Sequence, residues 1–446
     1  DMRGQKYVLQ VAPEDCTGCN LCVEVCPAKD RQNPEIKAIN MMSRLEHVEE
    51  EKVNYEYFLN LPEIDRSKLE RIDIRTSQLI SPLFEYSGAC SGCGETPYIK
   101  LLTQLYGDRM LIANATGCSS IYGGNLPSTP YTTDANGRGP AWANSLFEDN
   151  AEFGLGFRLT VDQHRQRVMR LLSEFADKLP AELNAALHAE ATPEVRREQV
   201  AALRQALAGV AGAEELLTDA DALVEKSVWL IGGDGWAYDI GFGGLDHVLS
   251  LTENVNILVL DTQCYSNTGG QASKATPLGA VTKFGEHGKR KARKDLGVSM
   301  MMYGHVYVAQ ISLGAQLNQT VKAIQEAEAY PGPSLIIAYS PCEEHGYDLA
   351  LSHDQMRQLT ATGFWPLYRF DPRRADEGKI PLALDSRPPS DALAETLLNE
   401  QRFRRLNAQQ PEVAEQLWKD AAADLQKRYD FLAQLAGKAE KSPSEG

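Results

Sequence analysis

The chain has 446 residues and a formal net charge of −16 at neutral pH. A chain of this length can bury more than one core, and its acidic balance argues against a nucleic-acid partner, because phosphate backbones require a positive field. No apolar run has the length of a membrane span and the first residues lead into no signal-peptide core, so we expect a cytoplasmic protein with no membrane partner. The nine cysteines stand in close Cys-x-x-Cys spacings, which favour metal or cluster ligation over a secreted disulfide framework.

The first predicted unit, residues 1–40, is a cysteine-rich module. Cys16, Cys19, Cys22 and Cys26, followed by proline, have the spacing of a bacterial ferredoxin. In that pattern three thiolates bind one 4Fe-4S cluster, and the fourth cysteine belongs to the other cluster of a two-cluster module. A structural zinc site is the weaker alternative. Because only 15 residues precede Cys16, we expect a partial module whose other ligands lie in upstream sequence.

The rest of the chain is expected to be one α/β domain with additions. Residues 41–82 are polar and indicate a linker, and residues 83–384 alternate apolar runs with helical sequence, which predicts a doubly wound parallel sheet. Residues 160–225 are rich in Ala, Glu and Arg and predict a helical insertion, whereas residues 385–446 predict a helical carboxyl-terminal extension with a frayed end. The predicted strands are the runs 110–113, 228–231, 255–260 and 334–338.

A second set of cysteines is scattered along the α/β region. Cys90 and Cys93 follow an apolar segment, Cys118 follows one predicted strand, and Cys342 follows another. Strand ends meet at one edge of a parallel sheet, so these thiols can converge on a second iron-sulfur cluster. On spacing alone, a Cys-x-x-Cys redox pair with two buried bystander thiols stays open as the alternative. Cys264 belongs to neither set of four cysteines.

A candidate diphosphate site follows two predicted strands. Gly233, Asp234 and Gly235 come directly after one strand, where backbone amides can face phosphate oxygens. Thr262 ends the next strand, and Asn267 begins a Gly-containing polar loop at the same edge. Mg²⁺ prefers hard oxygen ligands and bridges diphosphates, so this pattern has the form of a grip for thiamin diphosphate (TPP), although most TPP enzymes carry Asn-Asn where this chain has Asp-Thr. TPP beside an iron-sulfur cluster implies oxidative decarboxylation of a 2-oxo acid.

The chain resembles one family, the pyruvate:ferredoxin (or flavodoxin) oxidoreductases, over nearly its whole length. Three longer sequence motifs carry the resemblance. They are residues 136–142, 232–241 and 265–271. The resemblance is to the carboxyl-terminal portion of a longer polypeptide, and it implies conversion of pyruvate and coenzyme A to acetyl-CoA and CO₂, with electrons passing through 4Fe-4S clusters to ferredoxin or flavodoxin. It also implies a homodimer of the full-length chain. The upstream domains would carry the glutamate that activates TPP, so this portion alone is expected to be inactive.

The resemblance also implies roles for individual residues. The cluster nearest to TPP would be held by Cys90, Cys93, Cys118 and Cys342. Mg²⁺ would be bound by the side chains of Asp234 and Thr262 and by the backbone carbonyl of Cys264. Asn267 would also approach the 2-oxo acid and is the one catalytic candidate. The residues expected to bind the cofactor are Glu95, Cys118, Gly233, Asp234, Gly235, Trp236, Thr262, Gln263, Cys264, Tyr265, Ser266 and Asn267.

Two other functions stay open: an oxidoreductase for another 2-oxo acid, and a pure iron-sulfur electron-transfer module without TPP. The Gly-Asp-Gly and Asn-Thr-Gly-Gly motifs argue against the second. The basic run 289–294 is interpreted as a solvated face, with docking of an acidic flavodoxin or of coenzyme A phosphates as the alternative. His345 lies three residues after Cys342 and could tune the cluster by hydrogen bonding.

Overall fold

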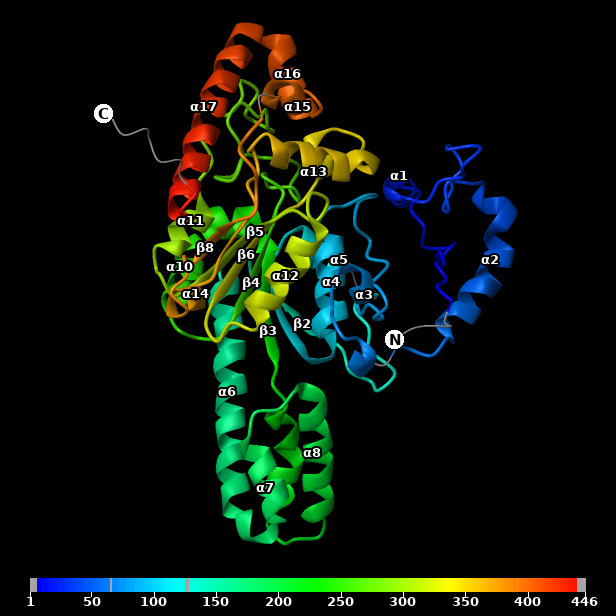
Figure 1. Ribbon diagram of the computed structural model, residues 1–446, viewed down its shortest axis with the longest axis vertical. Helices are drawn as coiled ribbons and strands as arrows, with labels where there is room; N and C mark the ends of the chain where they lie inside the picture. The colour runs from blue at the N-terminus through cyan, green and yellow to red at the C-terminus, as the bar shows by residue number, and fades with distance from the viewer. Residues whose placement is uncertain (1–5, 65, 125–127, 391, 439–446) are drawn as a thin grey trace.

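A central eight-stranded sheet carries the fold, with helices on both faces and three parts that extend from it (Figure 1). The computed structural model describes residues 6–438 apart from 65, 125–127 and 391. The amino-terminal segment lies to one side of the sheet, a helical insertion projects from one end, and the carboxyl-terminal helices lie at the opposite end. The expected frayed segment at 441–446 is outside the described residues.

The sheet has the order β2-β1-β3-β4-β6-β5-β7-β8. Its first six strands are parallel, as the sequence predicts, whereas β7 and β8 form an antiparallel edge that the sequence does not predict. The strands are β1 (Met110–Asn114), β2 (Ala141–Asn144), β3 (Ser227–Gly233), β4 (Asn256–Asp261), β5 (Tyr307–Ile311), β6 (Ser334–Tyr339), β7 (Tyr368–Phe370) and β8 (Leu382–Leu384).

The central strands are continuous apolar runs because both faces of the sheet are buried. In β3, Val228 and Leu230 pack into one core and Trp229 and Ile231 into the other, and each is at most 1 % exposed. One face is covered by α4 (Thr96–Tyr106) and α12 (Leu317–Glu328). The other is covered by α6 (Asn150–Glu174), α10 (Phe242–Ser250), α11 (Leu296–Met301), α13 (Ser352–Ala361) and α17 (Pro411–Leu435).

The helical insertion grows out of α6. This helix begins at Asn150, ahead of the residue 160 where the insertion was expected to start, and its first turns pack on the sheet. A Cβ on Gly154 would lie 2.3 Å from Cγ of Leu230, so the backbone of α6 touches β3 directly. Beyond the sheet, α6 packs with α7 (Ala181–His188), α8 (Pro193–Ala206) and α9 (Glu214–Asp219) around a core of their own, which includes Val168, Leu172, Leu187, Val200, Leu203 and Leu216.

The remaining helices are short or peripheral. The segment 41–82, expected to be a linker, contains α2 (Arg44–Leu59), which buries no residue and stands away from the sheet (Figure 1). Among the described residues, no helix has the length and apolar character needed to cross a membrane. The other helices are α1 (Leu21–Val25), α3 (Ile74–Ser77), α5 (Cys118–Gly123), α14 (Arg373–Asp376), α15 (Leu393–Leu397) and α16 (Gln401–Gln409). The short turns are η1 (Arg66–Lys68), η2 (Gly107–Arg109), η3 (Ala176–Lys178), η4 (Ala220–Leu223), η6 (Glu343–His345) and η7 (Leu349–Leu351), and η5 (Gly235–Ile240) is a π-helix.

Candidate active site at the carboxyl edge of the sheet

Three oxygen atoms meet where β3 and β4 end. The hydroxyl oxygen of Thr262 lies 3.0 Å from Oδ1 of Asp234 and 3.1 Å from the backbone carbonyl of Cys264. All three residues are buried. A carboxylate, a hydroxyl and a carbonyl in contact form the kind of hard oxygen set that Mg²⁺ prefers. The residues expected from the sequence to hold Mg²⁺ are therefore neighbours, and their chemistry fits the ion.

The carboxyl group of Asp234 is held at a raised pKa in the metal-free protein. Burial is the main cause, and the nearby charge of Asp261 adds to it, so that the pKa rises to about 8. Hydrogen bonds donated by the hydroxyls of Ser273 and Thr262 act in the opposite direction. A divalent cation at this place would favour the carboxylate and reverse the shift.

The backbone next to Asp234 is shaped by glycines. A Cβ on Gly233 would meet only a carbonyl oxygen 3.9 Å away, whereas a Cβ on Gly235 would lie 2.7 Å from the ring of Tyr265. Gly235 begins the π-helix η5, a rare form that is frequent at functional sites. The indole of Trp236 packs into the core, 2.6 Å from where a Cβ on Gly232 would stand.

The loop after β4 has a strained backbone. Gln263 is fully buried and has a φ of 61°, a left-handed conformation that is uncommon for residues other than glycine. Its N–H donates to Oδ1 of Asp261 at 3.1 Å. Its side-chain oxygen accepts a hydrogen bond from Arg402 at 2.8 Å. The side-chain oxygen of Gln263 is thus engaged, whereas its buried Nε2 has no hydrogen-bond partner among the described residues.

The four thiols of the second cysteine set come together beside these oxygens. Cys90, Cys93, Cys118 and Cys342 line one cavity of about 140 Å³, and Thr262 lines it too. Among the described residues, no three Cys, His, Asp or Glu side chains close around a single point as they would around a lone ion. Four thiolates spread around a shared cavity are what a cubane cluster requires, since its irons occupy separate corners. The other residues that line the cavity include Glu95, Tyr122, Ser266 and Asn267.

The thiols need the positive charge of iron to ionise. Burial raises the pKa of Cys90, of Cys93 and of Cys118, the last to about 12. The pKa of Cys342 is also raised, first by the adjacent thiol of Cys264 and then by burial. Cluster assembly would therefore release protons from this site, as metal binding to thiols generally does.

Polar side chains also line the cavity of the four thiols. The hydroxyl of Ser266 lies 3.3 Å from the sulfur of Cys118. Glu95 is buried and accepts a hydrogen bond from the hydroxyl of Tyr122 at 2.9 Å, and burial raises the pKa of Glu95 to about 7. Asn267 is exposed at the cavity rim. The site thus has a titratable carboxyl group that can be neutral or charged near neutral pH.

The first cysteine set lies against the second. Burial, and then the nearby thiols of Cys19 and Cys16, raise the pKa of Cys22, whereas the sulfur of Cys26 faces the carbonyl of Ala28 at 3.7 Å. The two loops that carry the two sets also touch. The hydroxyl of Ser91 donates to the hydroxyl of Thr17 at 3.3 Å, and a Cβ on Gly92 would lie 3.8 Å from Cβ of Cys19.

Sequence reasoning missed several residues around the site. The Nε2 of His345 donates to the carbonyl of Thr262 at 2.7 Å, and burial holds the pKa of His345 well below its usual value. The basic run is not simply a solvated face, because the side chain of Arg293 is only 10 % exposed and pairs with Asp261 at 2.7 Å. Ser273 and Arg402 carried no local motif that could have singled them out.

Comparison with known proteins agrees with this site. Residues 182–338 match the family model for the thiamine pyrophosphate enzyme, C-terminal TPP binding domain, and residues 9–29 match the model for a 4Fe-4S binding domain. Fold and site therefore define a TPP-binding domain joined to an iron-sulfur segment.

Relatives identify the family more closely. The chain is 93 % identical over its full length to a protein of Escherichia coli (strain K12) named "Probable pyruvate-flavodoxin oxidoreductase", of which it covers 38 %. It is 55 % identical to the pyruvate-flavodoxin oxidoreductase of Rhodospirillum rubrum, aligning over 99 % of this chain and 37 % of that one. It is 47 % identical to the pyruvate:ferredoxin oxidoreductase of Moorella thermoacetica, aligning over 97 % of this chain and 38 % of that one. The chain is thus similar over nearly its whole length to pyruvate-flavodoxin and pyruvate:ferredoxin oxidoreductases, and it spans little more than a third of the length of these relatives.

Proposed function

We propose that this chain is the part of a pyruvate oxidoreductase that grips TPP through Mg²⁺ and receives its electrons in a 4Fe-4S cluster. The proposal rests on the position of Thr262. Its hydroxyl joins the oxygens of Asp234 and Cys264, and the same residue lines the cavity of the four thiols. A cofactor held at the oxygens would therefore lie beside the cluster ligands.

The chain's own residues would supply binding, orientation and charge. When bound, TPP would supply the nucleophilic carbon and the electron sink needed to decarboxylate a 2-oxo acid, with the two released electrons leaving through the clusters and the acetyl group going to coenzyme A. Asp234, Thr262 and the carbonyl of Cys264 would hold Mg²⁺ against the diphosphate. Asn267, at the rim of the cavity, would approach the 2-oxo acid. Electrons that reach the second cysteine set would pass to the first, whose loop it touches.

The substrate, acceptor and assembly belong to the proposal as well. Pyruvate and flavodoxin or ferredoxin are inferred from the names of the relatives. We also expect a cytoplasmic homodimer of the longer polypeptide, which cell fractionation and the mass measured by light scattering would test. An oxidoreductase for another 2-oxo acid would show its own substrate preference in the assay below. A pure electron-transfer module would bind no TPP, and the match to the TPP-binding model disfavours it.

The test is pyruvate-dependent reduction of a viologen dye under anaerobic conditions. The described residues form one α/β sheet with one diphosphate motif, and a TPP enzyme needs a second domain to activate the aminopyrimidine. We expect no dye reduction by the 446-residue chain alone and restored reduction when the upstream portion of the Escherichia coli relative is supplied. Dye reduction by the isolated chain would contradict the assignment of the activating group to upstream sequence, and no reduction by the combined protein would contradict the function itself.

A further inference from the structure

The loop that would hold Mg²⁺ depends on the conformation of one residue. Gln263 stands between Thr262 and Cys264, and its left-handed φ of 61° turns the carbonyl of Cys264 back toward the hydroxyl of Thr262. A buried side chain longer than asparagine adopts this conformation only where its surroundings hold it there. The position of the third oxygen at the Mg²⁺ site therefore rests on whatever holds Gln263.

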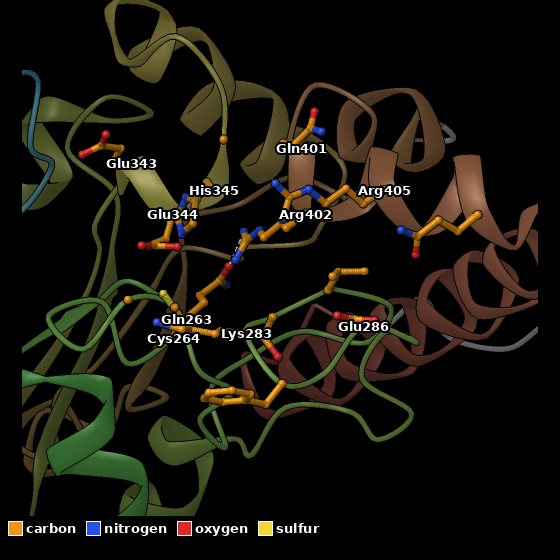
Figure 2. Close-up of a pocket in the computed structure, with 17 residues that line it drawn as sticks. Gln263, Cys264, Lys283, Glu286, Glu343, Glu344, His345, Gln401, Arg402 and Arg405 are labelled. Atoms are coloured by element: carbon orange, nitrogen blue, oxygen red, sulfur yellow. Dashed lines mark hydrogen bonds between the residues drawn. The ribbon is translucent and has the colours of Figure 1, made fainter.

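The side chain of Gln263 is held from the carboxyl-terminal extension. Nη2 of Arg402, in α16, donates to Oε1 of Gln263 at 2.8 Å, across 139 residues of sequence. Nε of the same guanidinium donates to Oε2 of Glu400 at 2.6 Å, and Glu400 accepts a further bond from Gln355 at 2.8 Å. Figure 2 shows Arg402 reaching from these helices to Gln263. Arg402 is 5 % exposed and Glu400 is fully buried.

The ion pair between Arg402 and Glu400 is poorly explained as a source of stability. Taking both charges out of water costs free energy that their attraction barely offsets, so apolar side chains of similar size would often stabilise the fold as well. The chain nevertheless places a buried guanidinium behind the loop. Two further contacts hold the same loop: Thr276 donates to the carbonyl of Gln263 at 2.6 Å, and His345 donates to the carbonyl of Thr262 at 2.7 Å.

We propose that Arg402 is a positioning residue for the Mg²⁺ site, and that the carboxyl-terminal extension thereby sets the metal affinity of the TPP grip. This inference rests on the proposed function. Without the hydrogen bond from Arg402, Gln263 can leave its left-handed conformation, and the Cys264 carbonyl then moves away from Thr262. Mg²⁺ would then lose one of its oxygen ligands, while the side chains of Asp234 and Thr262 stay in place.

The test compares Mg²⁺ dependence with TPP affinity in the cluster-loaded protein, using Arg402→Met. TPP binding is followed by isothermal titration at a series of Mg²⁺ concentrations. We expect the Mg²⁺ concentration for half-saturation to rise by about tenfold or more, as is typical when a residue supporting a metal ligand is removed. At saturating Mg²⁺, TPP affinity should be nearly that of the wild type. A general loss of structure would instead lower TPP affinity at every Mg²⁺ concentration.

Two further variants keep the test decisive. Arg369, on β7, is another arginine that is 9 % exposed, and it pairs with Glu326 and Asp385. Arg369→Met should leave the Mg²⁺ dependence unchanged. Gln263→Met keeps the length of the side chain but cannot accept the hydrogen bond from Arg402, so it should repeat the Arg402→Met effect even if that variant folds poorly.

The possible failures are distinguishable. Unchanged Mg²⁺ dependence in both Arg402→Met and Gln263→Met would overturn the positioning role alone, as would an equal change in Arg369→Met. If the wild-type protein itself binds TPP without any dependence on Mg²⁺, the proposed function fails before Arg402 is at issue.

Discussion

Asp234→Asn should affect ligand binding and stability in opposite directions. The substitution keeps the shape of the side chain and removes its charge. Without that charge the Mg²⁺ site loses its only carboxylate among the three contacting oxygens, so binding of TPP with Mg²⁺ should weaken strongly. In the metal-free protein the same charge destabilises the fold, because Asp234 is buried and its pKa is raised to about 8 by burial and by Asp261.

The sign and size of the stability effect follow from linkage. A carboxyl group whose pKa is higher in the folded than in the unfolded state contributes stability at low pH, and that contribution is lost as the pH rises through the folded pKa. For Asp234 the loss runs from about pH 4 to pH 8. Between pH 6 and pH 8, the wild type should lose about 2 kcal/mol that Asp234→Asn retains, at about 1.4 kcal/mol per pH unit below the folded pKa.

The assay is urea denaturation of both proteins in a chelator, under anaerobic conditions, at pH 6 and at pH 8. The quantity compared is the change in unfolding free energy between the two pH values, wild type minus variant, so that all other titrating groups cancel. The same proteins are then titrated with TPP and Mg²⁺. Equal pH dependence in the two proteins, or a wild type that gains stability relative to the variant at pH 8, would refute the reasoning about Asp234.

Three further substitutions test other parts of the site and fold. Cys342→Ala should remove one cluster's worth of iron and sulfide, and an unchanged iron content and paramagnetic resonance spectrum of the reduced protein would contradict the ligand assignment. Gly235→Val should weaken TPP binding by about tenfold or more in the same titration, because its side chain would displace the ring of Tyr265, which lies 2.7 Å from the Cβ position. Gly154→Leu should destabilise the protein by about 3 kcal/mol in urea denaturation, because α6 has no room for a side chain against Leu230; unchanged stability would show that the helix can move.

The sequence predicts the central strands well because β3, β4 and β6 are buried on both faces and read as unbroken apolar runs. It also predicts that polar residues at their ends converge, since Asp234 and Thr262 follow neighbouring parallel strands. The edge strands β7 and β8 have three residues each and no such run, so they leave no recognisable pattern.

Contacts between distant segments escape sequence reasoning for a different reason. Arg402 lies 139 residues from Gln263, and Arg293 lies 32 residues from Asp261. Each arginine stands in ordinary polar helical or loop sequence, and nothing in its neighbours indicates which side chain it meets. The basic run was therefore interpreted as solvated, although the fold buries one of its members against a carboxylate at the active site.

The central claim is that TPP held at Asp234 delivers electrons to the cluster of the second cysteine set. The most direct test is reduction of that cluster by pyruvate, followed by paramagnetic resonance in the chain combined with the upstream portion of its Escherichia coli relative. In the wild type, pyruvate and dithionite should each reduce this cluster. In Asp234→Ala, only dithionite should reduce it. Reduction of Asp234→Ala by pyruvate at the wild-type rate would contradict the account.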